Sequence, residues 1–109
     1  MVNKARIRMW VKALRSGKYK KGTKALHLTP DMYCCLGVAC DVYRKRGGLL
    51  EHGWESLGGL PKTVREWYGL VECDPTLGGV PATIMNDRHR RTFKFIADRI
   101  EEEFLGKKK

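Results

Sequence analysis

One stretch of the sequence decides the fold: Tyr33-Cys34-Cys35-Leu36-Gly37-Val38-Ala39-Cys40-Asp41-Val42-Tyr43. Apart from Asp41, every residue in it is apolar, small or aromatic. A helix drawn through it is apolar on all sides, so neighbouring elements must bury it. The run Arg44-Lys45-Arg46 and the pair Gly47-Gly48 follow, and cations and glycine are typical of a helix C-terminus. We therefore predict a central helix that begins at about Thr29 or Tyr33 and ends at Arg46.

Four further helices are predicted around this one. The first runs from a cap at Asn3 to about Ser16, because Ile7, Trp10, Val11 and Leu14 recur with helical spacing. The last begins near Thr92, and its apolar face is Phe93, Ile96, Ala97, Ile100 and Phe104. Between them, Leu60-Pro61 opens a helix that carries Val64, Trp67 and Tyr68 and ends at Gly69, and Pro81 starts a short one that stops at Asn86-Asp87.

The remaining segments are predicted to be short connections. Residues 17–28 allow a short hairpin or an extended loop, and Thr29-Pro30-Asp31 is typical of a helix start. Residues 47–59 and 72–79 are loops, and we expect Leu49, Leu50, Trp54 and Leu57 to anchor the first of them in the core. The predicted fold class is mainly α, or α+β with one small hairpin. We expect one globular domain over residues 1–106, a basic tail at 107–109, and a core that includes Trp10, Leu36, Val38, Trp67, Ile96 and Ile100.

Composition bounds the cellular setting. No apolar run approaches the roughly 18 residues that a membrane helix needs, and no apolar secretory core follows the basic N-terminus. We therefore expect a cytoplasmic protein without a membrane partner. Cys34 and Cys35 are adjacent, which strains a mutual disulfide, and Cys40 and Cys73 complete no regular disulfide framework. The expectation is reduced, buried thiols.

The net charge of +10 is unevenly distributed. No acidic residue precedes Asp31, a second basic cluster runs from Arg88 to Lys94, and the chain ends on three lysines. Such asymmetry indicates a phosphate-bearing partner, either a nucleic acid or a nucleotide, and an acidic protein is the alternative partner. A solvated basic face that only confers solubility would have the same composition. The candidate ligand-binding residues are Arg6, Lys12, Arg15, Lys18, Tyr19, Lys20, Lys21, Arg88, Arg90 and Arg91, and Tyr19 could stack on a base of a single strand.

The adjacent cysteines also permit a cysteine-dependent hydrolase. A thiol at a helix N-terminus has a lowered pKa, so Cys34 or Cys35 could act as the nucleophile if the central helix begins at Tyr33. The candidate bases are His27, His52 and His89, with Asn86 or Asp87 as the orienting group. If the helix begins at Pro30, both thiols lie more than a turn inside it. Because free cysteine is among the most buried residue types, structural thiols are the favoured interpretation.

Other kinds of site are disfavoured. Structural zinc sites use C-x(2–4)-C pairs. Cys35 and Cys40 have such a spacing, but residues five apart on a helix point away from each other, so no metal or other cofactor is expected. A helix-turn-helix over residues 80–104 would need a polar recognition helix, and none follows Phe104. The pairs Gly58-Gly59 and Gly78-Gly79 lack phosphate-loop spacing. Glu101 to Glu103 are read as a solvated helix end rather than as paired catalytic carboxylates.

The central stretch resembles small uncharacterised proteins of tailed bacteriophages that carry a (Tyr/Phe)-Cys-Cys-Leu-Gly-Val-x-Cys-Asp motif, here residues 33–41. Similar phrases are Leu-Pro-x-x-Val-x-x-Trp at 60–67, Asn-Asp at 86–87 and Phe-x-x-Ile-Ala-Asp-x-Ile-Glu at 93–101. The chain departs at residues 88–91, where a shorter glycine-containing turn is usual. The resemblance implies a phage accessory protein in the host cytoplasm and supplies no activity. We expect a non-enzymatic binding protein, and host-defence antagonism is a use consistent with that origin and small size.

Overall fold

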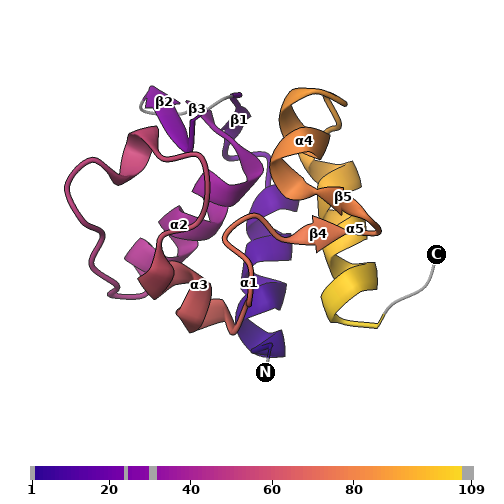
Figure 1. Ribbon diagram of the computed structural model, residues 1–109, viewed down its shortest axis with the longest axis horizontal. Coiled ribbons are helices and arrows are strands. Elements are labelled where there is room, and N and C mark those ends of the chain that lie inside the picture. Colours follow the sequence, from indigo (N-terminus) through magenta and orange to yellow (C-terminus); the bar gives the residue numbers. More distant parts are fainter. Residues whose placement is uncertain (1, 24, 30–31, 107–109) are drawn as a thin grey trace.

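The computed structural model describes residues 2–23, 25–29 and 32–106, without the side chains of residues 28 and 29. Within them the fold is mainly helical, as predicted (Figure 1). The elements in chain order are α1 (Lys4–Arg15), β1 (Lys20–Lys21), β2 (His27–Thr29), β3 (Met32–Tyr33), α2 (Cys35–Lys45), the 3-10 turn η1 (Trp54–Ser56), α3 (Lys62–Tyr68), β4 (Thr76–Leu77), β5 (Val80–Pro81), α4 (Ala82–Asp87) and α5 (Phe93–Phe104).

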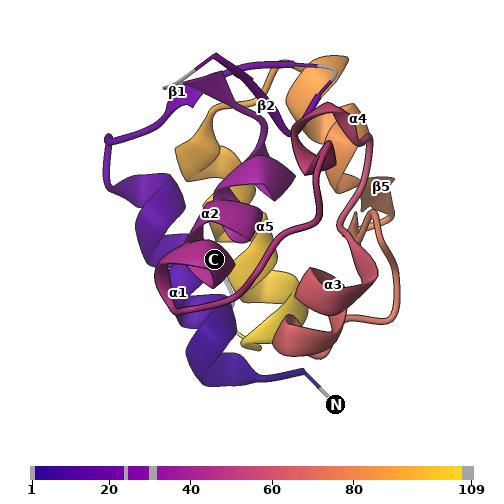
Figure 2. The ribbon, with the colours of Figure 1, turned by 90° about the vertical axis from the view of Figure 1, so that its left-hand side faces the viewer.

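Helix α1 lies among the other long helices. Asn3 caps it by accepting a hydrogen bond from the Arg6 N–H at 3.1 Å, and Gly17 follows its end in the left-handed region. The predicted stripe of Ile7, Trp10, Val11 and Leu14 is buried. Figure 1 shows α5 running beside α1 in the opposite direction, and Figure 2 shows α2 on another side of it. One amphipathic stripe therefore serves several helix interfaces.

Helix α2 is buried on all sides, as its composition predicted. Every residue from Cys35 to Val42 is buried. Trp10 Nε1 donates to the Cys35 carbonyl at 2.9 Å, and the Tyr68 hydroxyl donates to the Ala39 carbonyl at 2.7 Å. These bonds tie α1 and α3 to the central helix.

The start of α2 decides between the two predicted starts. Cys34 is the N-cap, and its Sγ accepts from the Gly37 N–H at 3.4 Å. A start at Thr29 is wrong, because Thr29 lies in β2 and Met32–Tyr33 form β3. The N–H and C=O groups that a longer helix would use for its own hydrogen bonds pair between the strands instead. The predicted helix start at Pro30 and Asp31 falls outside the described residues.

Residues 17–28, for which a short hairpin or an extended loop was predicted, do not form a hairpin between β1 and β2. Strand β3 lies between β1, which is parallel to it, and β2, which is antiparallel. The Gly22 N–H donates to the Tyr33 carbonyl at 2.7 Å, and the Cys34 N–H donates to the Leu26 carbonyl at 3.1 Å. Both segments therefore find their partners in the residues just before α2, rather than in each other.

The second half follows the predicted order of helices, with one addition. Gly69 ends α3 in the left-handed region, and Thr92 caps α5 by accepting from the Phe95 N–H at 3.1 Å. The addition is the β4–β5 hairpin, whose turn residues Gly78 and Gly79 both have positive φ. No helix of the described residues has the length and apolar character that crossing a membrane requires.

Some predicted core positions are not in the core. Leu49 and Leu57 are 87% and 43% exposed, so they do not anchor their loop, whereas Trp54 is buried. Trp67 is only half-buried, and the Arg6 guanidinium lies over its ring, 4.4 Å from the centroid. The other predicted core residues, Trp10, Leu36, Val38, Ile96 and Ile100, are fully buried in one cluster.

Candidate functional site

The N-terminus of α2 carries the two adjacent thiols. Cys34 is its N-cap and Cys35 its first residue, the placement in which a helix end can lower a thiol pKa. Burial acts in the opposite direction and is stronger here. It raises the pKa of Cys34 to about 11 and that of Cys35 well above the ordinary value, and the negative charges of Asp87 and Asp74 add to both effects. The thiol form is therefore favoured at neutral pH.

The surroundings of Cys34 are acidic. A small cavity of about 180 Å³ borders it and is also lined by Leu26, Thr83 and Asp87. Asp74 accepts hydrogen bonds from the Thr83 N–H at 3.0 Å and from the Thr83 hydroxyl. An acidic side chain cannot serve a neighbouring thiol as the electropositive group that activates it.

The three candidate bases are placed elsewhere. The His27 ring stacks on Tyr33, with 4.0 Å between centroids, and lies 5.8 Å from Trp54. His52 is exposed in the loop before η1, and His89 is exposed in the turn after α4. Among the described residues, no hydrogen bond joins a cysteine to a histidine. The fold therefore does not assemble a thiol–imidazole pair there.

Within the part of the chain that the structure describes, Asn86 does not bond a histidine, as a residue that orients a catalytic base would; its partners are backbone groups and Asp87. It is fully buried, its Oδ1 accepts from the Cys35 N–H at 3.2 Å, and its Nδ2 donates to the Gly22 carbonyl at 2.9 Å and to Asp87 Oδ1 at 2.7 Å. These bonds pin α4 to the start of α2 and to the segment after β1. Asn86 thus satisfies buried backbone groups.

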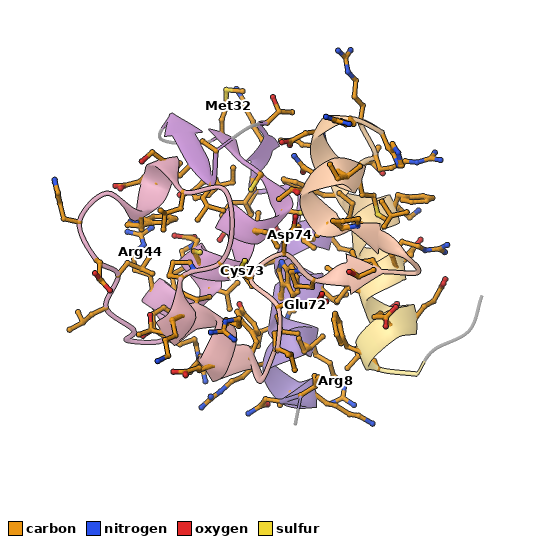
Figure 3. The ribbon with its side chains drawn as sticks, viewed as in Figure 1. Arg8, Met32, Arg44, Glu72, Cys73 and Asp74 are labelled. Atoms are coloured by element: carbon orange, nitrogen blue, oxygen red, sulfur yellow. The ribbon has the colours of Figure 1, made fainter. Side chains whose placement is uncertain are left out.

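The described part of the chain contains no group of three histidine, cysteine or acidic residues that could hold a metal ion. All four cysteines are free thiols. Cys73 is exposed on the segment that joins α3 to β4, next to Asp74 (Figure 3), so the expectation that every thiol is buried is wrong for it.

Two of the candidate ligand-binding arginines are engaged by the fold. Arg15 donates to Asp98 at 2.6 Å and to both oxygens of Glu101 at 2.7 and 3.0 Å, and these bonds raise the Arg15 pKa. Arg6 donates to the Trp67 carbonyl at 2.9 Å and stacks on that ring. Glu101 is therefore not a solvated helix end as predicted, and Arg15 is not free to meet an anion.

The two basic clusters of the sequence meet at one end of the molecule. Lys21 Nζ donates to the Asn86 carbonyl at 2.8 Å, which fixes β1 beside the end of α4. Lys94, on the first turn of α5, borders a groove of about 450 Å³ together with Gly17 and Tyr19. Figures 1 and 2 both place β1 and the α4–α5 turn at the same end. We call this surface the basic end, and it comprises Lys18, Lys20, Lys21, Arg88, Arg90 and Lys94.

Arg91 lies beside the basic end but faces an aromatic ring. Its guanidinium is 4.4 Å from the centroid of Phe95, and that of Arg99 is 5.0 Å from the same ring. Such contacts hold a guanidinium without neutralising it. Arg88 and Arg90 are exposed in the same turn.

Tyr19 is anchored by its hydroxyl. It donates to Asp41 at 2.5 Å, and Arg44 and Lys45 complete the partners of that carboxylate. Burial alone would raise the pKa of Asp41, but the hydrogen bonds from Tyr19 and Arg44 outweigh burial and lower it. The Tyr19 ring packs edge-on against Tyr33, with 4.9 Å between centroids. The aromatic residue predicted to stack on a base is therefore held in one position.

Lys94 and Arg46 were not among the candidate residues, although both lie close to the predicted ones in space. Lys94 belongs to the second basic cluster, and Arg46 belongs to the basic run after the central stretch. Their positive charge made Lys94 and Arg46 possible members of a basic surface. Only the packing of the helices shows that they lie beside residues of α1 and the following loop.

Comparison with curated proteins and with solved structures gave no match. A family model described as a domain of unknown function, DUF8296, matches residues 2–104. That range runs from the residue before the Asn3 cap to the last residue of α5, so it includes both basic clusters and the central helix. The chain therefore belongs to the DUF8296 family.

Proposed function

We propose that this protein binds a phosphate-bearing ligand, a nucleic acid or a nucleotide, through its basic end. The observation that carries the proposal is the meeting of two basic clusters that lie about 70 residues apart in the sequence. Other cations are engaged within the fold: Arg6 donates to the Trp67 carbonyl, and Arg15 donates to Asp98. The cations of the basic end are gathered on one surface instead.

The charge balance of this surface supports a polyanion. Lys18, Arg88, Arg90 and Lys94 are exposed, and among the described residues none of the four pairs with a carboxylate. Lysines act as mobile point charges and arginines can hold a phosphate with two parallel hydrogen bonds. Neutralising phosphates also releases condensed counterions, which makes such binding strongly salt-dependent.

The resemblance to phage proteins extends the proposal to a setting. In an infected cell, the ligand would be a host or phage nucleic acid or a nucleotide, and sequestering it would antagonise host defence. A binding protein needs no catalytic group for this role. The raised pKa values of Cys34 and Cys35 disfavour the alternative, a hydrolase that uses one of these thiols as its nucleophile.

The test compares two variants that change net charge equally. Lys18→Glu/Lys94→Glu reverses charges at the basic end, whereas Lys4→Glu/Lys62→Glu reverses two exposed lysines at the starts of α1 and α3. Fluorescence anisotropy with a labelled oligonucleotide at 50 and 200 mM salt should show about tenfold or greater loss for the first variant and little change for the second. The first variant should also reduce the slope of log K against log salt by roughly 1 to 2.

Equal losses in the two variants would mean that net charge alone attracts the probe, and the basic end would not be a site. No binding of DNA, RNA or nucleotides by the parent protein at 50 mM salt would overturn the proposal. An acidic protein would then be the partner to seek.

A further inference from the structure

A second groove adjoins the basic end, between α1 and α2. It has a volume of about 280 Å³, and Met9, Ala13, Tyr19 and Val42 provide apolar and aromatic surface along it. Met9 and Ala13 lie four residues apart on α1, on a stripe next to the buried one, and Val42 lies on the last turn of α2. Figure 2 shows the two helices side by side. The cations that border the groove are Lys12, Lys18, Lys45 and Arg46.

The charge in this groove favours an anion. Lys45 pairs with the buried carboxylate of Asp41 at 3.3 Å. Lys12, Lys18 and Arg46 are exposed, and within the described residues none of them has an acidic partner. Both helices end near the groove, and each helix C-terminus contributes roughly half a negative charge. Three unpaired cations therefore outweigh about one opposing charge.

The apolar lining distinguishes this groove from a simple phosphate patch. A ligand that fills it would combine apolar surface with negative charge. A nucleobase attached to phosphate has that combination, and base–aromatic stacking tolerates any base sequence. The Tyr19 ring is already ordered by Asp41 and Tyr33, so binding would not cost its rotamer entropy. The Lys45 ammonium lies over this ring, 5.5 Å from its centroid, and a stacking base would displace it toward the phosphates.

We infer that the groove between α1 and α2 holds an unpaired nucleobase, with its phosphates on Lys12, Lys18 and Arg46. The base comes either from a single strand or from a free nucleotide, which share this chemistry. Bases of an intact duplex are stacked and paired, so a duplex cannot deliver one without the cost of unstacking. This inference rests on the proposed function and specifies the ligand of the adjoining surface.

The experiment separates base contacts from phosphate contacts. Binding of the parent protein is measured for a labelled single strand, an abasic strand of the same length and a duplex of the same length, with mononucleotides as competitors. The single strand should bind roughly fivefold or more tightly than the abasic strand, which is the effect of stacking one base. Competition by a mononucleotide at micromolar concentration would identify the free nucleotide as the source, and its failure would identify the strand.

Matched variants test the ring itself. Tyr19→Phe and Tyr19→Leu both lose the hydroxyl bond to Asp41, but only the first keeps an aromatic face. The preference for bases over abasic sites should persist in Tyr19→Phe and disappear in Tyr19→Leu. Should Tyr19→Leu fail to fold, Met9→Glu and its control Met9→Leu probe the groove wall, where the added carboxylate should weaken binding at least tenfold.

The outcomes are distinguishable from failure of the proposed function. Equal binding of abasic and base-containing strands, tighter binding of the duplex, or equal base preference in Tyr19→Phe and Tyr19→Leu would overturn the groove assignment and leave the basic end standing. No binding of any probe by the parent would overturn both proposals.

Discussion

Gly37 allows the backbone of Leu26, the residue before β2, to approach the central helix closely. A Cβ atom at this position would lie 1.8 Å from the Leu26 carbonyl oxygen, 2.7 Å from its carbon and 3.2 Å from Leu26 Cα. These are backbone atoms, so no side-chain rotation can relieve the clash. The same carbonyl accepts the Cys34 N–H at 3.1 Å, and Leu26 is fully buried. Gly37→Ala must therefore displace this contact.

Opposing contributions set the magnitude. Alanine is the better helix former, which alone would stabilise α2 by about 1 kcal/mol. Forcing a methyl group into a packed contact costs about 1–3 kcal/mol. Leaving the buried Cys34 N–H unpaired costs about 1–3 kcal/mol more. The net expectation is a loss of roughly 3 kcal/mol in the free energy of unfolding, equivalent to a fall of roughly 10–20 °C in Tm for a domain of this size.

Denaturant titration followed by circular dichroism measures this change. The matched control is Gly58→Ala, because a Cβ at Gly58 meets no atom within 4 Å and its φ is outside the left-handed region. Gly58→Ala should change stability by less than about 0.5 kcal/mol. If Gly37→Ala were as stable as the parent or more stable, the gain in helix propensity would equal or exceed the cost of the clash. The close approach of Leu26 to α2 would then be refuted.

Two further predictions concern the buried carboxylate and the thiols. Because its pKa is lowered in the folded state, ionised Asp41 contributes stability above its unfolded pKa of about 3.9 that is lost as pH falls through the folded value. Asp41→Asn should lower the free energy of unfolding at pH 7 by about 1.5–3 kcal/mol and progressively less below pH 4, and a gap independent of pH would contradict this. In native protein, iodoacetamide should label exposed Cys73 first and leave Cys34 and Cys35 unlabelled until unfolding, with Cys73→Ser as the control. Rapid native labelling of either buried thiol would favour a hydrolase.

Local patterns predicted the helices well, because helix formation depends on nearby residues. The stripe of α1 and the caps Asn3 and Thr92 act within one or two turns, so the periodicity and the capping residue were sufficient. The burial of α2 on all sides also followed from its composition, since an apolar surface on every side must be covered. In contrast, β1 and β3 are short and pair in parallel, and the local pattern of residues 17–28, which allowed a hairpin, did not predict this pairing.

The candidate site was predictable in part. Clusters of lysine and arginine were visible as composition, but composition cannot say which cations the fold will neutralise. Arg15, a candidate ligand-binding residue, is paired with carboxylates because antiparallel packing of α1 and α5 brings Asp98 and Glu101 to it. The Tyr19 ring lines the groove between α1 and α2, and its hydroxyl donates to Asp41, 22 residues further along the sequence.

By itself, the sequence determined that the chain forms a mainly helical domain around one apolar helix, and that its surface is strongly basic. Those properties follow from hydrophobic periodicity, local capping and net charge, which each residue carries wherever the chain folds. Only the tertiary structure decided where α2 begins and which cations pair with carboxylates of the same chain. It also brought the two basic clusters to one end of the molecule. These depend on contacts between residues far apart in sequence, such as Lys21 with Asn86, whose geometry exists only when the helices have packed.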